Sequence, residues 1–386
     1  MEEFIKNNKT FAIHLFSGAG ALTLGTAATY PFDTIKTLIQ VGSGPDKQLS
    51  ASQVFDRVRK LSGYSGLYNG FGWLALARIY GVGARFGTYE LLTAFYKDGR
   101  KDNYVYVSEA LMAGLAAGAV ESLMSSPFEL FTIRSQVTAA SRVPKAASRV
   151  PKSSTALEIT SASSSTAKLL RAYTPDVKAL NHSVGLLSTL NTKQLNLTDP
   201  LKEYPWMITG TGRAPPVYHV RKPVDVVSLE GWGALWRGLR PGLVRDTIFG
   251  GVFFSSWQFM HRAMLDWKAV GMDPIPSSDE DVGPLHPLAV SLAAGISGSV
   301  AGAASHSFDT AKCRSQCLVL PKYITMERKF LRWTLPGKRF ERYTGIHPRD
   351  RNILFRGIWL RMARSGVASF IFVGSYFFAI DHLVSK

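Results

Sequence analysis

Cysteine is nearly absent from the 386-residue chain, which contains only Cys313 and Cys317, four residues apart. Two cysteines exclude a disulfide scaffold, and a metal site would need more ligands than this pair offers. We interpret both as buried free thiols. Acidic residues are also scarce, because 28 Asp and Glu are set against 45 Lys and Arg, which leaves a net charge of +17. An acidic partner is therefore expected: anionic lipid, an anionic solute or nucleic acid.

Signals for processing and for catalysis are missing as well. The first residues, Met1-Glu2-Glu3-Phe4, resemble neither a signal peptide nor an Arg-rich transit helix, so no cleaved leader is expected. The chain shows no nucleophile–base set, phosphate loop or metal-ligand spacing above chance, so we expect neither an enzyme nor a cofactor. Nucleic-acid binding is not expected, because a membrane-facing or phosphate-attracting role accounts for the basic charge.

Six apolar segments each exceed the roughly 20 residues that cross the hydrocarbon core of a bilayer. They cover about 11–39, 71–96, 105–136, 239–264, 286–317 and 358–383. Glycine, proline or a charge interrupts several of them, as expected where charges face an internal cavity instead of lipid. The glycine pairs Gly114–Gly118 and Gly298–Gly302 favour close helix contacts. The sequence thus predicts an all-α membrane protein with six transmembrane helices.

The loops between these segments divide by charge. Those after the first, third and fifth segments are basic, whereas those after the second and fourth are short or acidic, as at Asp279-Glu280-Asp281. Such a bias sets the orientation in a membrane, with the three basic loops on one side and both termini on the other. The loop at 137–229 is much longer than its equivalents and contains Ser-Arg-Val-Pro-Lys twice. Its composition predicts a solvated, largely disordered insert, either a tolerated expansion or a segment that docks a protein partner.

One short motif occurs three times, each time after a Gly/Ala-rich apolar run. The copies are Pro31-Phe32-Asp33-Thr34-Ile35-Lys36 with Gln40, Pro127-Phe128-Glu129-Leu130-Phe131-Thr132 with Gln136, and Ser307-Phe308-Asp309-Thr310-Ala311-Lys312 with Gln316. After a polar loop follow Tyr68-Asn69-Gly70, Trp236-Arg237-Gly238 and Phe355-Arg356-Gly357. Internal repeats fix the architecture. We therefore predict a single domain, 1–386, of three units at 11–100, 104–265 and 285–383.

This threefold pattern resembles the mitochondrial carrier family, over nearly the whole chain apart from the insert. The resemblance implies six transmembrane helices in three repeats with pseudo-threefold symmetry, the mitochondrial carrier fold. It also implies a multi-pass protein of the mitochondrial inner membrane that carries a small-molecule solute by exchange or import. The basic loops would face the matrix. A plastid envelope or a peroxisomal membrane is the alternative location.

By the same resemblance, the repeated acids and cations form a salt-bridge gate on the matrix side. The expected pairs are Lys36 with Glu129, Thr132 with Asp309, and Lys312 with Asp33. The middle pair lacks a cation, and Gln40, Gln136 and Gln316 would brace the ring. The opposite gate keeps only Glu90 of the charges typical of the family, which raises the alternative of a carrier-fold protein with a structural or interaction role.

Glycines that open short surface helices expose backbone N–H groups that hold phosphate. By resemblance these are cardiolipin sites, so cardiolipin is the expected bound lipid. The candidates are Gly63, Gly70, Gly231, Gly238 and Gly357. Simple turn glycines are the alternative interpretation.

Each even-numbered segment carries an arginine near its middle, where a charge is costly unless it meets water or a ligand. These are Arg78, Arg245 and Arg364, and by resemblance they match substrate contact points. The pair Arg245-Asp246 is typical of carriers of amino acids and their derivatives, since arginine binds a carboxylate and aspartate an ammonium. Arg85 and Glu121 would also line the cavity, or else pair helices. The competing substrate class is a nucleotide or cofactor, which Asp246 would repel.

Overall fold

The computed structural model describes residues 9–43, 49–98, 100, 104–140, 217, 220–272, 282–319 and 348–384. All regular structure within these ranges is helical, and no strand occurs among them. Most of the expected insert (141–216 and 218–219) and the acidic loop at 279–281 lie outside the described residues. The hypotheses about them therefore stay predictions.

The three repeats share one order of elements. The first contains α2 (Lys9–Gly42), α3 (Ala51–Ser62), the 3-10 helix η1 (Tyr64–Tyr68) and α4 (Phe71–Lys97). The second contains α5 (Val107–Ala139), α10 (Pro223–Glu230), η5 (Trp232–Trp236) and α11 (Leu239–Val270). The third contains α12 (Pro287–Ala304), α13 (His306–Gln316), η6 (Pro348–Phe355) and α16 (Ile358–Val384). Both edges of the expected insert are helical, because α5 reaches Ala139 and α10 begins at Pro223.

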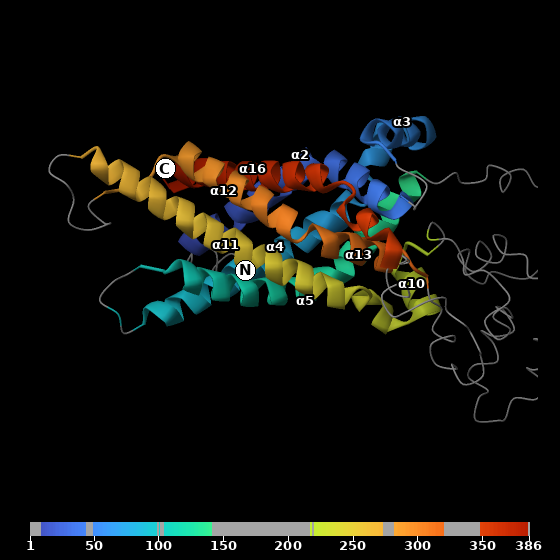
Figure 1. Cartoon of the computed structure of the whole chain (residues 1–386), viewed down its shortest axis with the longest axis horizontal. Helices are drawn as coiled ribbons and strands as arrows, with labels where there is room; N and C mark the ends of the chain where they lie inside the picture. The colour runs from blue at the N-terminus through green and yellow to red at the C-terminus, as the bar shows by residue number, and fades with distance from the viewer. Residues whose placement is uncertain are drawn as a thin grey trace, which may run out of the picture.

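The long helices form a closed ring. α4 lies between α2 and α5, α11 between α5 and α12, and α16 between α12 and α2. Helices α3 and α10 lie at one end of this bundle, whereas the carboxyl terminus lies at the other (Figure 1). This arrangement confirms the predicted all-α carrier fold.

Small residues allow the closest contacts in the ring, as their spacing predicted. A Cβ on Gly114 would lie 2.5 Å from the carbonyl oxygen of Gly250, so α5 and α11 touch through their backbones. A Cβ on Gly298 would lie 2.9 Å from the carbonyl oxygen of Ser365, which brings α12 against α16 in the same way. In a bilayer the hydrophobic effect does not drive helices together, so van der Waals contacts of this kind stabilise their association.

The first long helix of each repeat differs at the position of the repeated proline. Pro31 and Pro127 lie inside the continuous helices α2 and α5. The third repeat has Ser307 at the equivalent position, and there the helix is interrupted at Ser305, with φ −96° and ψ 6°. The expected single segment 286–317 is therefore two helices, α12 and α13. The contacts that hold this break come from α16, as described below.

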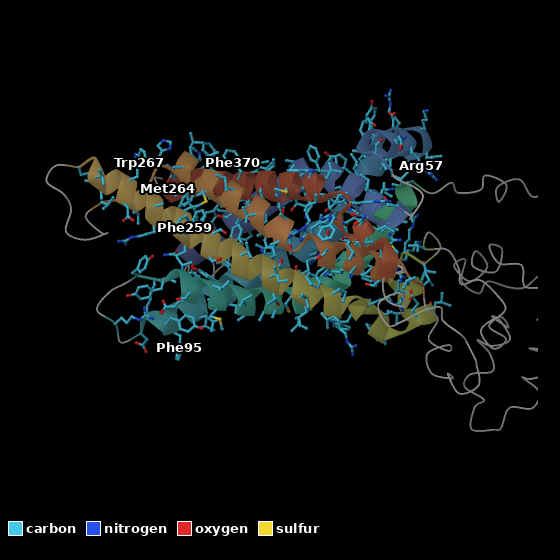
Figure 2. The ribbon with its side chains drawn as sticks, in the orientation of Figure 1. Arg57, Phe95, Phe259, Met264, Trp267 and Phe370 are labelled. Carbon is cyan, nitrogen blue, oxygen red and sulfur yellow. The ribbon has the colours of Figure 1, made fainter. Side chains whose placement is uncertain are left out.

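Apolar side chains cover the outside of the bundle and charges fill its inside. Phe95, Phe259 and Trp267 are 73%, 65% and 85% exposed and project from the surface (Figure 2). By contrast, Lys312 and Asp309 are almost fully buried. This distribution is the reverse of that in soluble proteins and suits a lipid environment.

Three helices of the described part are long and apolar enough to cross a membrane: Val107–Ala139, Pro287–Ala304 and Asn352–His382. Six such spans were expected from the sequence. Helices α4 and α11 exceed the required length, but α4 contains Arg78 and Arg85 and α11 contains Arg245 and Asp246. These charged residues lower the mean hydropathy of the two helices.

A charged cavity between two closed ends

One cavity collects the arginines that the sequence analysis singled out. Arg78, Arg85, Arg245, Asp246 and Arg364 all line it, in a space of about 120 Å³. The cavity extends from the repeated acids and cations towards aromatic side chains of α4, α11 and α16. Arg78, Arg245 and Arg364, which the sequence placed near the middle of three different segments, thus line one cavity.

The repeated acids and cations form two groups of ion pairs that Arg245 joins. We call these five residues the gate ring: Asp33, Lys36, Glu129, Asp309 and Lys312. Lys36 Nζ lies 2.9 Å from Asp309 Oδ2 and 3.3 Å from Asp33 Oδ1. Lys312 pairs with Glu129. All five side chains are less than a tenth exposed. The predicted members of the gate therefore do meet.

The partners within the gate ring differ from the predicted ones. Lys36 pairs with Asp309 and not Glu129, and Lys312 pairs with Glu129 and not Asp33. Thr132 does not bind Asp309, because its hydroxyl donates to the Phe128 carbonyl one turn earlier. Three residues advance an α-helix by about 300°, so each cation lies to one fixed side of its acid. In this bundle that side faces the preceding repeat, which residue spacing alone does not reveal.

Two of the three glutamines brace the ring as predicted. Gln40 Nε2 donates to Asp309 Oδ2 at 3.1 Å, and Gln136 Nε2 donates to Asp33 Oδ2 at 2.9 Å. Each glutamine therefore binds an acid of another repeat. Gln316 is fully buried, but neither polar atom of its side-chain amide has a hydrogen-bond partner among the described residues.

Arg245 connects the gate ring to the cavity wall. Its Nε lies 2.7 Å from Asp246 Oδ1, its Nη2 lies 2.9 Å from Glu129 Oε1, and its Nη1 lies 3.2 Å from Asp309 Oδ1. All three nitrogens of the guanidinium thus donate to carboxylates, which leaves at most one N–H of Nη1 for a ligand. The predicted substrate pair Arg245-Asp246 is therefore satisfied within the protein.

The remaining predicted site residues differ in whether they make an ion pair. Arg85 pairs with Glu121 of α5, and its guanidinium carbon lies 4.7 Å from the centre of the Phe249 ring. Glu121 does not line the cavity, so its contact with Arg85 joins helices. Arg364 Nε lies 3.1 Å from Asp33 Oδ1. Among the residues that the structure describes, Arg78 makes no ion pair, although it lines the cavity.

Arg361 is a site residue that the sequence analysis missed. Its Nη1 lies 2.5 Å from Asp309 Oδ1, and its Nε donates to the Gly302 carbonyl oxygen at 3.0 Å. Its Nη2 donates to Ser305 Oγ at 2.7 Å. Arg361 thus stabilises the break between α12 and α13 where the other repeats have proline. A charge one turn before Arg364 in an apolar segment was the available signal.

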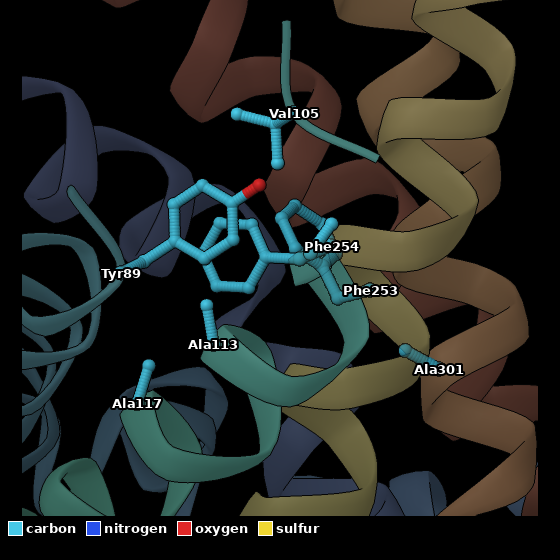
Figure 3. Packing of buried hydrophobic residues seen from close by; sticks show 8 residues of the cluster. Tyr89, Val105, Ala113, Ala117, Phe253, Phe254 and Ala301 are labelled. Carbon is cyan, nitrogen blue, oxygen red and sulfur yellow. The ribbon is translucent and has the colours of Figure 1, made fainter. Parts of the chain in front are cut away.

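Aromatic rings meet beyond the cavity on the side away from the gate ring. Phe86 of α4 contacts Phe254 of α11 with a centroid distance of 5.5 Å and Phe372 of α16 with a centroid distance of 5.9 Å. Tyr89 stacks on Phe254 above Ala113 and Ala117 of α5 (Figure 3). We call Phe86, Tyr89, Phe254 and Phe372 the aromatic closure. It joins α4, α11 and α16 near Glu90, the charge that remains of the expected second gate.

The candidate lipid glycines all occupy turns with positive φ. Gly63, Gly70, Gly231, Gly238 and Gly357 have φ between 70° and 88°. Gly70 and Gly238 directly precede α4 and α11 in the left-handed conformation. This backbone requirement alone explains glycine there, so lipid binding stays a prediction.

The edge of the expected insert takes part in the core. Arg134 Nη1 lies 2.5 Å from Glu230 Oε1 of α10, and it donates to the Val220 carbonyl oxygen at 3.0 Å. Glu230 also pairs with Arg237. Burial lowers the pKa of Arg237, and the Glu230 carboxylate partly opposes that shift. Contacts with the core therefore already occur at Val220, nine residues before the predicted end of the insert at 229.

Comparison with known proteins agrees with this geometry. A sequence model described as mitochondrial carrier protein matches residues 7–100. The mitochondrial dicarboxylate/tricarboxylate transporter of Arabidopsis thaliana is 30% identical over 120 residues, which is 31% of this chain and 39% of the relative. Mitochondrial citrate transporter D of Aspergillus niger is 30% identical over 147 residues, 36% of this chain and 48% of the relative.

A longer match covers more of the chain at lower identity. Mitochondrial thiamine diphosphate carrier 2 of Zea mays is 22% identical over 262 residues, 65% of this chain and 59% of the relative. The matched stretches thus span 39% to 59% of these relatives. Residues 7–100 thus match the mitochondrial carrier family, and the three helical repeats extend that resemblance to the rest of the described chain.

Proposed function

We propose that this protein transports an organic anion across the mitochondrial inner membrane through the cavity between the gate ring and the aromatic closure. The observation that carries the proposal is the charge of the cavity wall. Among the described residues, six basic and four acidic side chains line the cavity, so it has an excess of two positive charges. An excess of this size is expensive in a membrane interior unless a ligand or water offsets it.

The proposed substrate class is a di- or tricarboxylate. Arg78 supplies a guanidinium without an ion-pair partner in the described part of the chain, and Arg364 lines the same cavity. Arginine binds carboxylates through two parallel hydrogen bonds, which suits such a substrate. Two relatives bear names that specify dicarboxylate, tricarboxylate or citrate transport.

An amino-acid-derived substrate is the hypothesis that the Arg245-Asp246 pair favoured in the sequence. That substrate would have to separate Arg245 from Asp246, whose Nε and Oδ1 atoms lie 2.7 Å apart. A phosphorylated cofactor is the other candidate, since one relative is named a thiamine diphosphate carrier. Asp246 is neutralised by Arg245, so it does not by itself exclude phosphate. Both classes are outcomes of the transport assay below.

The transport assay uses purified protein in liposomes loaded with unlabelled citrate, succinate, glutamate or thiamine diphosphate. Uptake of the same labelled compounds from outside is then measured. We expect citrate or succinate to exchange, and we expect Arg78→Gln to reduce uptake at least tenfold. Arg262→Gln is the matched control, because Arg262 pairs with Asp266 at the far end of α11. Exchange of glutamate alone would replace the carboxylate proposal with the amino-acid one.

A role without transport is the second candidate function. The observation in its favour is the aromatic closure, whose rings cannot form charge pairs between repeats as they close. Absence of exchange for all four compounds, together with a protein that co-purifies through residues 141–216, would support it. Deletion of 141–216 that leaves exchange intact would count against that role for the insert.

Location and lipid contacts follow as parts of the same proposal. The relatives with mitochondrial names and the apolar helices support a mitochondrial membrane, and we propose the inner one, crossed six times. Cardiolipin would bind at the backbone N–H groups of the turns at Gly63, Gly70, Gly231, Gly238 and Gly357, because helix N-termini hold phosphate. A lipid requirement in the liposome assay tests this directly.

A further inference from the structure

The gate ring contains two of the three cations that the repeats would supply, because the second repeat has Thr132 where the others have Lys36 and Lys312. The observed pairs show which acid the third cation would bind. Lys36 of the first repeat binds Asp309 of the third, and Lys312 of the third binds Glu129 of the second. Both links run in the same direction around the ring. The missing third link would therefore join position 132 of the second repeat to Asp33 of the first.

The glutamines confirm that α5 presents this position to Asp33. Gln40 lies four residues after Lys36 and donates to the acid that Lys36 binds, Asp309. Gln136 lies four residues after Thr132 and donates to Asp33 at 2.9 Å. Because residues four apart share a helix face, position 132 faces Asp33 as well. Thr132 has no charge, and its hydroxyl is engaged with the Phe128 carbonyl.

Arg364 brings a charge to Asp33 from a different element, α16. Its Nε lies 3.1 Å from Asp33 Oδ1, and both side chains are at most a tenth exposed. Lys36 Nζ lies 3.3 Å from the same oxygen, and Arg78 is the further cation on this wall of the cavity. The Arg364 Nε–H makes no hydrogen bond among the described residues, so the guanidinium is paired by charge without being fixed in direction.

We propose that Arg364 is the third cation of the gate ring and that an anion in the cavity opens the gate by drawing Arg364 away from Asp33. This rests on the proposed transport of an anion. A ligand shifts a conformational equilibrium only through different affinities for the two states. Arg364 provides this difference, because its guanidinium binds Asp33 in the closed state and the ligand carboxylate in the open state. A lysine at position 132 would instead pair with Asp33 whether or not an anion occupies the cavity.

The gate part of the proposal is tested without any ligand. Cys313 lines the cavity beside the gate ring and is 2% exposed, so it reports opening. In a Cys317→Ser background, reconstituted protein is treated with an impermeant maleimide from the side of α3 and α10. We expect Arg364→Gln to speed the labelling of Cys313 at least fivefold, and we expect the double variant Arg364→Gln/Thr132→Lys to return the rate to within twofold of the background.

The coupling part is tested with citrate and succinate in the same assay. Either anion should speed labelling several-fold when Arg364 is present, and it should have less effect in Thr132→Lys, where the gate has its own cation. Failure of Thr132→Lys to slow labelling in the folded double variant overturns the assignment of Arg364 to the gate. If Thr132→Lys restores slow labelling but no anion speeds labelling in the background protein, the proposed opening of the gate by an anion is wrong. If the liposomes also take up none of the compounds, the transport proposal is wrong as well. Thermal unfolding of each variant identifies loss of folding; if Arg364→Gln does not fold, the single variant Thr132→Lys carries the test, because an anion should then speed labelling less than in the background.

Discussion

Tyr89 of α4 stacks on Phe254 of α11 with 3.7 Å between ring centres and 7° between ring planes. Phe254 is 2% exposed, and it also contacts Phe86, which in turn contacts Phe372 of α16. Three helices from three repeats therefore meet through rings at one end of the cavity. Apolar contacts can close this end because they exclude water and need no charge partner.

We predict that Phe254→Ala weakens this closure. Removal of a buried phenylalanine side chain costs about 3–5 kcal/mol in soluble proteins, and the lost ring contacts fall within this figure. The expected result is a lower midpoint of thermal unfolding and a faster leak of loaded citrate from liposomes. Phe259→Ala is the matched control on the same helix, since Phe259 is 65% exposed on the outer surface (Figure 2). Equal leak from both variants would contradict a closing role for the rings.

Gly118 provides a test of the helix ring. A Cβ at this position would lie 2.9 Å from Thr247 Cα and closer still to the Asp246 carbonyl, so α5 and α11 would have to separate. We expect Gly118→Ala to destabilise the protein by about 1–3 kcal/mol, as overpacking does. In Gly20→Ala the new methyl meets nothing within 4 Å, and stability should hold or rise by about 0.5–1 kcal/mol. Opposite signs in thermal unfolding would confirm the contact.

The arginines and the repeats show how far sequence reasoning reached. The apolar segments predicted the helices, three copies of one motif predicted the repeats, and the arginines near the middle of three segments predicted one shared cavity. All three features are visible in the sequence itself. The partners of Lys36 and Lys312 did not follow, because spacing fixes an angle on a helix and leaves open which neighbouring helix lies there.

The features that the sequence did not predict arise from contacts between residues far apart in the chain. The roles of Arg361 and of the aromatic closure depend on which residues meet across helices. Phe86, Phe254 and Phe372 are three of 22 phenylalanines, and nothing local distinguishes them. Arg361 was visible as a charge in an apolar segment. Its hydrogen bond to the Gly302 carbonyl depends on the helix break at Ser305, which the sequence does not predict because no proline lies there.

Substitutions of Arg361 distinguish the contribution of its positive charge from that of its planar set of donors. Its guanidinium binds Asp309, the Gly302 carbonyl and Ser305 Oγ together. Lysine would keep the charge at Asp309 but lacks the planar fork of donors. We expect Arg361→Lys to lose part of the stability and Arg361→Ala to lose about 3–5 kcal/mol, since it leaves a buried carboxylate with fewer partners. Thermal unfolding of both variants checks the order, and equal losses would assign the whole effect to the geometry of the break.

The last prediction concerns the turn glycines Gly63 and Gly238. Both have positive φ, at 70° and 79°, so alanine at either site carries a backbone penalty of about 1–2 kcal/mol. A Cβ on Gly63 meets nothing within 4 Å, whereas one on Gly238 would lie 2.6 Å from Ser315 Oγ. Gly238→Ala should therefore lower the unfolding midpoint more than Gly63→Ala in detergent without added lipid.

Added cardiolipin then distinguishes the two interpretations of these glycines. If their turns hold a lipid phosphate through backbone N–H groups, cardiolipin raises the midpoint of the parent protein by mass action and raises it less in both variants. If the glycines serve the turn alone, cardiolipin raises all three midpoints equally. Gly233→Ala is the control, because Gly233 lies in η5 between these sites and a Cβ there meets nothing within 4 Å. An equal cardiolipin response in all four proteins would remove the lipid assignment and leave the turn geometry as the reason for glycine.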